Sequence, residues 1–308
     1  MRCTYIVSLL AISLGLPVAL HAEEHLPAAL IRVPESVQSI FVAETNTAKF
    51  HRFDRSGDSM VHQGAYYMSI GTAGAGKQRS GDRRTPLGVY FVTERLDTSR
   101  LHEKYGVMAF PLDYPNAWDK RAQRSGDGIW VHGVDPGGGE RPTLDTDGCV
   151  ALRNSDLMAL APSFSENITP VVVVRDVNWA TPHENTELRA ELEASVAVWV
   201  NAVSSADLHA YSSLYDNDFQ RWGLNKAQWS AVSAKAAITQ LLSGQVIGEQ
   251  SMSDLLLLRY PEEEGVYLSR FRLHRAIEVE GRVIETTKRL YWRRNAQGAL
   301  RVIAEDDG

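Results

Sequence analysis

The hydrophobic pattern of the chain changes once, at residues 176–186, and this change limits the folds available to each half. From Ser39 to Val174, short apolar or alternating runs are separated by clusters of Gly, Pro and Asp, as is typical of β-strands joined by turns. After residue 186, apolar residues first recur at helical spacing and then alternate along four long runs. The sequence therefore predicts a mainly β half, a sandwich or barrel, followed by an α+β half.

The boundaries of these units follow from the same pattern. We expect the β-rich domain over residues 38–176, a linker over 177–186 and the α+β domain over 187–308.

The first residues have the features of an export signal. Arg2 supplies a positive charge, an apolar run from Tyr5 to Leu14 is too short to span a bilayer, and Ala22 offers a small residue for cleavage. The sequence predicts a signal peptide over residues 1–22 and a mature protein that is soluble in the periplasm. An uncleaved N-terminal anchor is the alternative.

Removal of this signal would take Cys3 away and leave Cys149 as a single cysteine. Exported proteins use cysteines in pairs, so a single one indicates an intermolecular bridge or a reactive thiol. The formal net charge of −6 argues against nucleic acid as a partner.

A glycine-rich stretch at residues 71–78, "GTAGAGKQ", resembles a phosphate-binding loop that lacks its final Ser or Thr, because Gln78 follows Lys77. Gly81 and Pro86 leave no room for the helix that such a loop needs. We therefore interpret this stretch as a mobile glycine loop and not as a nucleotide site.

Cys149 has one well-placed candidate base. His132 ends an apolar strand in "GIWVHG", and a Gly/Pro-rich loop leads from it to Cys149. A strand, a loop and a returning strand can bring a thiol and an imidazole within hydrogen-bond reach, as cysteine acyl transfer requires. Gly148 allows a tight turn whose amides could face an oxyanion. On spacing alone, a polar His132 at a strand end and an inert buried Cys149 are equally well supported.

The motifs "IWVHG" and "TDGCVAL", with "TPLGVYF" upstream, resemble the signature of the L,D-transpeptidase (YkuD) family. The C-terminal half is similar to a nuclear-transport-factor-2-like (NTF2-like) cone, a pairing found in the cell-shape L,D-carboxypeptidase branch. The resemblance implies Cys149 as nucleophile and His132 as base, with Gly133 and Gly148 supporting the backbone and the oxyanion. It also suggests three candidate substrate-binding residues: Thr146, Asp147 and Arg153.

Two positions depart from the family pattern. Asp147 stands where most members have His, and Ala151 stands where many have Arg. An ionised Asp147 close to the thiol would oppose thiolate formation. Arg153 could take over carboxylate recognition or form a surface ion pair.

The resemblance implies peptidoglycan stem peptides as substrate and no metal or organic cofactor. Cys149 would cleave the bond between the L-centre and D-alanine and pass the acyl group to an amine. Trimming of tetrapeptide to tripeptide, with water as acceptor, is the close alternative. The other hypotheses are a zinc peptidase using His132, Asp147 and a distant histidine, and a non-catalytic wall-binding protein.

The C-terminal domain has a set of aromatic residues that could line a pocket or form an ordinary core: Trp199, Tyr211, Tyr215, Trp222 and Trp229. Through this domain the protein would bind wall glycan, a protein partner or a second copy of itself.

Overall fold

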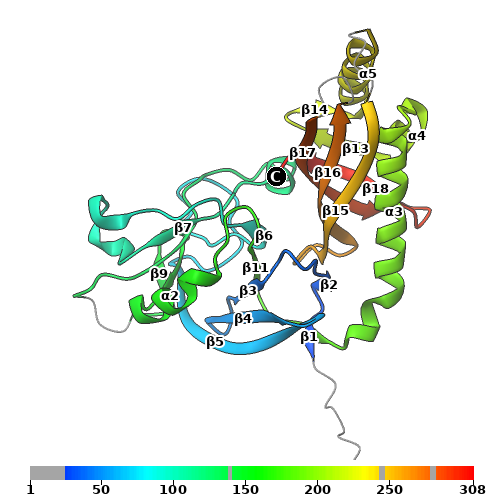
Figure 1. Cartoon of the computed structure of the whole chain (residues 1–308). Coiled ribbons are helices and arrows are strands. Elements are labelled where there is room, and N and C mark those ends of the chain that lie inside the picture. The colour runs from blue at the N-terminus through cyan, green and yellow to red at the C-terminus, as the bar shows by residue number, and fades with distance from the viewer. Residues whose placement is uncertain (1–24, 138–140, 243–246, 278–281) are drawn as a thin grey trace, which may run out of the picture.

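The structure, a computed structural model, describes residues 25–137, 141–242, 247–277 and 282–308. Two lobes lie side by side, one β-rich and one built from a long sheet and helices (Figure 1). The predicted signal peptide over residues 1–22 lies outside the described residues. Among the described helices, none has the length and hydropathy needed to cross a bilayer.

The N-terminal lobe is mainly β, as predicted. Its strands are hydrogen-bonded in the order β6-β11-β3-β4-β5-β10-β8-β7, with β9 also paired to β5. These strands are β3 (Ser39–Glu44), β4 (Lys49–Ser56), β5 (Ser59–Gly71), β6 (Gly88–Phe91), β7 (Ala109–Pro111), β8 (Trp130–His132), β9 (Leu144–Thr146), β10 (Val150–Leu152) and β11 (Pro170–Val174). The short helices are η1 (Thr98–Arg100), η2 (Glu103–Tyr105), α1 (Ala117–Arg121), α2 (Asn154–Leu160) and η3 (Ala161–Ser163).

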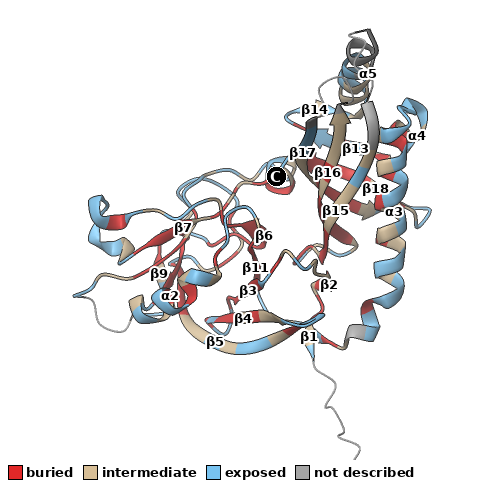
Figure 2. Ribbon diagram, in the orientation of Figure 1, coloured by how far each residue is buried: buried red, intermediate tan, exposed pale blue. Residues whose placement is uncertain are grey.

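Strand β3 is buried along its whole length because each of its faces packs on a different core (Figure 2). Phe41 and Ala43 join the core of the N-terminal lobe, where Phe41 stacks on Phe164 with ring centroids 4.5 Å apart. Ile40 and Val42 face a second cluster that also contains residues of the C-terminal lobe. Side chains alternate along a strand, so this one β-strand ties the two lobes together.

The C-terminal lobe has the predicted order of helices before long strands, and its sheet runs β14-β13-β18-β17-β16-β15-β2. Its helices are α3 (Thr186–Ser204), α4 (Leu208–Ser213) and α5 (Lys226–Leu242). Its strands are β13 (Tyr215–Arg221), β14 (Leu224–Asn225), β15 (Ile247–Arg259), β16 (Val266–Ile277), β17 (Arg282–Arg294) and β18 (Leu300–Asp306). The apolar face of α3 packs on this sheet through Leu192, Val196 and Trp199.

The N-terminal segment crosses from one lobe to the other. Strand β2 (Leu30–Arg32) pairs with β15 at the edge of the second sheet, and β1 (Leu26–Pro27) pairs with β12 (Trp179–Ala180). The turn η4 (Pro182–Asn185) then leads into α3. Residues before position 38 therefore complete the C-terminal lobe, which the sequence pattern does not indicate.

Buried polar contacts fix the lobes against one another. Arg289 of β17 forms ion pairs with Asp113 of the N-terminal lobe and with Asp306 of β18. Asn116 donates a hydrogen bond to the Tyr260 hydroxyl at 3.1 Å. Together with the apolar cluster that both lobes share, these contacts join the two lobes.

The glycine-rich stretch at residues 71–78 is packed, and the expectation of a mobile loop is wrong. Ala75 forms a β-bridge with Thr85, and the buried Lys77 donates a hydrogen bond to Asp82 at 2.8 Å. A buried ammonium group such as that of Lys77 needs a charged partner, and the Asp82 carboxylate supplies it. The expectation from the sequence did not include Asp82.

Candidate active site

Cys149 and His132 lie on neighbouring parallel strands. Strand β10 pairs with β8 in a register that sets Val150 opposite Val131 and Ala151 opposite His132. Cys149 comes directly before β10, two residues from Ala151, so it projects on the same side as Ala151. The strand–loop–strand arrangement predicted from sequence therefore brings the thiol and the imidazole to one face of the sheet.

The residues on the opposite face of β8 and β10 fix the orientation of His132 and Cys149. Val131, Val150 and Leu152 belong to the buried core of the N-terminal lobe. Because side chains alternate, burial of these three residues directs His132 and Cys149 away from the core. Both remain largely shielded from water, with 4% and 8% of their surfaces exposed, respectively.

His132 is held in one tautomer. Its Nδ1 lies 2.6 Å from the Gly133 carbonyl oxygen, which can only accept, so Nδ1 carries the proton and Nε2 is the basic nitrogen. The Tyr105 ring contacts the imidazole edge-on, with centroids 5.3 Å apart. Burial lowers the pKa of His132 to about 4, so the imidazole is neutral at neutral pH and can accept a proton.

The thiol of Cys149 donates a hydrogen bond to the Gly128 carbonyl at 3.3 Å. Burial raises the pKa of the Cys149 thiol to about 11. A backbone hydrogen bond from Trp130 and the charge of Lys104 act in the opposite direction and lower this pKa. The resting pair is therefore a neutral thiol and a neutral imidazole. Proton transfer to His132 would accompany attack on a substrate and not precede it.

The turn before Cys149 depends on Gly148 and Thr146. Gly148 has φ +130°, and a Cβ there would lie 2.8 Å from the Arg84 carbonyl oxygen. The Thr146 hydroxyl donates to the Cys149 carbonyl at 2.7 Å and accepts from the Gly148 amide at 3.1 Å. These contacts hold the turn. The Gly148 amide is already engaged here, so its oxyanion role stays a prediction, as does substrate binding by Thr146.

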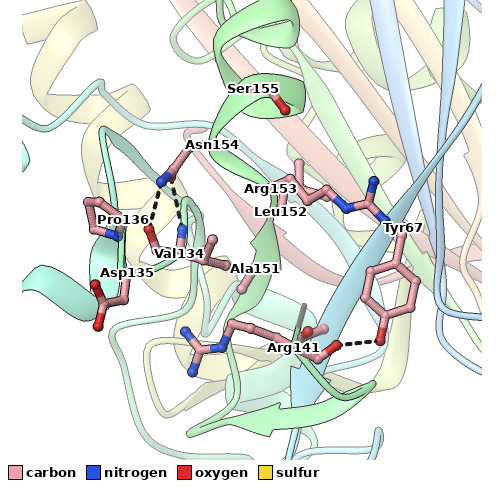
Figure 3. A pocket seen from close by; sticks show the side chains of 11 residues that line it. Tyr67, Val134, Asp135, Pro136, Arg141, Ala151, Leu152, Arg153, Asn154 and Ser155 are labelled. Carbon is pink, nitrogen blue, oxygen red and sulfur yellow. Dashed lines mark hydrogen bonds between the residues drawn. The ribbon is translucent and has the colours of Figure 1, made fainter. Parts of the chain in front are cut away.

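Asn154 braces the loop that follows His132. A Cβ on Gly133 would lie 2.2 Å from the Asn154 side-chain oxygen, so the loop can approach only because residue 133 is glycine. The same amide accepts from the Val134 N–H at 3.0 Å and donates to the Val134 carbonyl at 2.8 Å (Figure 3). Gly133 thus supports the backbone, and its own amide donates to the Met108 carbonyl.

Asp147 points outward and has a partner that sequence reasoning missed. Its carboxylate accepts a hydrogen bond from Lys104 of η2 at 3.2 Å, and both side chains are well exposed. Their charges act on the pKa of Cys149 in opposite directions, Asp147 raising it and Lys104 lowering it. Lys104 therefore offsets the unfavourable charge at this position. No motif surrounds Lys104 in the sequence, so only the fold brings it here.

A pocket of about 520 Å³ is lined in part by β10, the strand that follows Cys149. Ala151, Arg141, Arg153 and Tyr67 are among its lining residues, and Arg153 extends toward the Tyr67 ring (Figure 3). Two guanidinium groups in one pocket suit a ligand that carries carboxylates, and Arg141 is already paired with Asp145. Carboxylate recognition by Arg153 stays a prediction, and Arg141 joins it as a residue that the motifs did not indicate.

The zinc hypothesis rested on His132, Asp147 and a distant histidine. Over residues 25–137, 141–242, 247–277 and 282–308, no three His, Cys, Asp or Glu side chains are grouped as a metal site would require.

The opposed charges of Lys104 and Asp147 give a testable expectation. Asp147→Asn should raise the rate of Cys149 alkylation by iodoacetamide at pH 8.5 and low salt by roughly two- to five-fold, because loss of the anion lowers the thiol pKa. Lys104→Met should slow alkylation by a similar factor, and the double variant should react like the wild type. Equal rates for all four proteins would show that neither charge reaches the thiol.

Comparisons with known proteins agree with this geometry. Residues 42–173 match the L,D-transpeptidase catalytic domain (YkuD), and residues 191–306 match the Cds6 C-terminal NTF2-like domain. No curated protein matches the chain.

Two solved structures resemble nearly the whole chain. Bd1075 from Bdellovibrio bacteriovorus is 25% identical, with a TM-score of 0.71 over 92% of this chain and 98% of that one. The helical cell shape determining protein Pgp2 from Campylobacter jejuni is 21% identical, with a TM-score of 0.73 over 91% of this chain and 95% of that one. The chain therefore consists of a catalytic domain of the YkuD L,D-transpeptidase family followed by a C-terminal NTF2-like domain.

Proposed function

We propose that the protein is an exported, periplasmic cysteine acyl transferase of L,D-transpeptidase type that acts on peptidoglycan stem tetrapeptides. The observation that carries this proposal is the placement of Cys149 and His132 on one face of paired parallel strands, with the basic Nε2 of His132 defined by the Gly133 carbonyl. A nucleophile and a base oriented by a third group are what covalent acyl transfer needs.

In the first half-reaction, the Cys149 sulfur attacks the carbonyl of the L-centre while Nε2 of His132 takes the thiol proton. The C–N bond to D-alanine breaks, and His132 returns the proton to the departing amine. A thioacyl enzyme is left. In the second half-reaction, His132 takes a proton from the acceptor as the acceptor attacks the thioester carbonyl. The C–S bond then breaks, and His132 returns the proton to the sulfur of Cys149.

The acceptor defines two candidate reactions. An amine from a second stem would give a cross-link, which is the general activity of the family. Water would give a tripeptide, and the second candidate is therefore an L,D-carboxypeptidase. The C-terminal NTF2-like domain and the departures at Asp147 and Ala151 support this second candidate. The likeness of nearly the whole chain to a helical cell shape determining protein supports a role in cell shape.

Incubation of the purified protein with disaccharide tetrapeptide, followed by mass spectrometry, separates the candidates. We expect release of D-alanine, with 3-3 linked dimers if an amine is the acceptor. Tripeptide monomers alone would identify water as the acceptor. Absence of both products, together with no acylation of Cys149 by a β-lactam, would contradict the enzyme proposal and leave a wall-binding protein.

A further inference from the structure

The loop over residues 77–84 is folded around one carboxylate. Asp82 accepts a hydrogen bond from the Lys77 side chain at 2.8 Å. It also accepts from three backbone amides at 2.7–3.2 Å, those of Gln78, Arg79 and Arg84. A carboxylate with four donors holds such a loop in one conformation. The loop is therefore a fixed support for the side chains that project from it.

This loop contacts the turn before Cys149. A Cβ on Gly148 would lie 2.8 Å from the Arg84 carbonyl oxygen, so the two backbones are in close approach. Burial dominates the pKa of the Cys149 thiol, and the charge of Lys77 is among the influences that lower it. Side chains of the loop are thus within reach of a substrate bound at Cys149.

A pocket of about 320 Å³ lies beside the loop, between it and Glu262 and Glu263 of the C-terminal lobe. Four cationic side chains line the pocket. Three of them already have acidic partners: Lys77 with Asp82, Arg124 with Asp119 and Glu263, and Arg175 with Glu262. The acidic residues of the pocket are therefore already engaged.

The fourth cation is Arg84, and its charge is not neutralised. Its Nη1 donates a hydrogen bond to the Ala75 carbonyl at 3.0 Å, and in the part of the chain that the structure describes no carboxylate pairs with it. The residue is exposed. A guanidinium has five N–H donors in one plane, and a carboxylate can accept from two of them at once. Arg84 is thus a positioned cation with donors left for a ligand.

The position of the pocket limits which carboxylate of a stem peptide could enter it. Neither Cys149 nor His132 lines the pocket, so its ligand group lies some way from the bond that is cleaved. The carboxylate of the departing D-alanine is adjacent to that bond. The residue before the L-centre is D-glutamate linked through its γ-carboxyl, so its α-carboxylate is free. Bond lengths place this carboxylate roughly 7–10 Å from the carbonyl that Cys149 attacks.

We propose that Arg84 binds the free α-carboxylate of the D-glutamate that precedes the L-centre. This inference rests on the proposed function and deepens it, because it names a specificity-determining residue for the donor stem. The pocket that contains Arg141 and Arg153 shares no lining residue with this one, so the two are separate. A stem whose D-glutamate is amidated to D-isoglutamine loses the charge that Arg84 recognises.

Two synthetic tetrapeptide stems, one with D-glutamate and one with D-isoglutamine, test this role. For release of D-alanine by the wild type, we expect kcat/KM to be about 10-fold higher with the D-glutamate stem. Arg84→Gln should lower kcat/KM about 10-fold for the D-glutamate stem and leave the D-isoglutamine stem nearly unchanged. Arg83→Gln is the matched control, because Arg83 is exposed on the same loop but does not line the pocket. It should change neither rate.

Binding to the Cys149→Ala variant gives a readout that needs no turnover. The ligand is disaccharide tripeptide, which contains D-glutamate but no terminal D-alanine, and the measurement is calorimetry. Adding Arg84→Gln should weaken binding about 10-fold, whereas adding Arg83→Gln should leave it unchanged.

Three outcomes would overturn the inference. One is a wild type that does not distinguish the two stems. The second is an equal loss on both stems in Arg84→Gln, which would mean that Arg84 only supports the turn before Cys149. The third is undiminished tripeptide binding after Arg84→Gln, which would leave the D-alanine carboxylate as the ligand of Arg84. If the wild type releases no D-alanine from either stem, the proposed function fails, and tripeptide binding still decides the role of Arg84.

Discussion

Replacing Cys149 by alanine should reduce release of D-alanine from tetrapeptide stems by a factor on the order of 10⁴ or more, because the reaction loses its only nucleophile. The fold should persist, since the buried side chain of Cys149 is small and alanine lacks only its thiol group. The measurement is D-alanine release by mass spectrometry, with the urea unfolding midpoint as control. Turnover near the wild-type rate would contradict the nucleophile assignment.

His132→Ala extends this expectation. Nucleophile and base act as a unit, so the single variant should lose nearly as much activity as Cys149→Ala, and the double variant should lose little more. Because the pKa of His132 is about 4, kcat/KM should begin to fall at a lower pH than it would with a free imidazole as the base. Activity should persist as the pH falls through 6.5 and disappear only as His132 becomes protonated.

Replacing Arg289 by alanine should lower the free energy of unfolding by about 3–5 kcal/mol, because it leaves two carboxylates, each with only 16% of its side chain exposed, without their cation. Arg289 is 6% exposed and is paired with Asp113 across the lobes and with Asp306 of the neighbouring strand β18. Urea unfolding followed by tryptophan fluorescence measures the change.

Arg272→Ala is the matched control on the neighbouring strand. Arg272 also has two acidic partners, Asp254 at 2.9 Å and Glu285 at 3.1 Å, but its side chain is partly exposed. Water screens such pairs, and we expect a loss of less than about 1 kcal/mol. Equal losses for the two variants would mean that the buried contact between the lobes contributes no more than a surface pair.

Much of the geometry of the candidate active site was predictable because its parts are close in sequence or have special backbone requirements. His132 and Cys149 flank one loop, and parallel pairing of the strands at its ends leaves few other arrangements. Gly148 was predictable because glycine allows a tight turn directly before Cys149. The order of helices and long strands in the C-terminal lobe follows directly from the change in hydrophobic periodicity.

The parts that were missed depend on contacts between distant residues. Lys104 reaches Asp147 only because η2 folds over the end of β8, and Arg141 enters the pocket from a loop without a motif. Strand β2 is too short to be recognised from its pattern, and its partner β15 lies near the other end of the chain. Arg289 and Asp113 meet across the interface between the lobes, which no local pattern describes.

The placement of β2 also sets an order of events during folding. This strand is among the first parts of the described chain to be synthesised, yet Leu30 and Arg32 pair with Leu258 and Leu257, which emerge late. Closing so long a loop is slow relative to forming local hairpins such as β3–β4. The N-terminal segment therefore cannot complete its pairing before β15 has been made, so the folding of one of the earliest described parts of the chain depends on one of the latest.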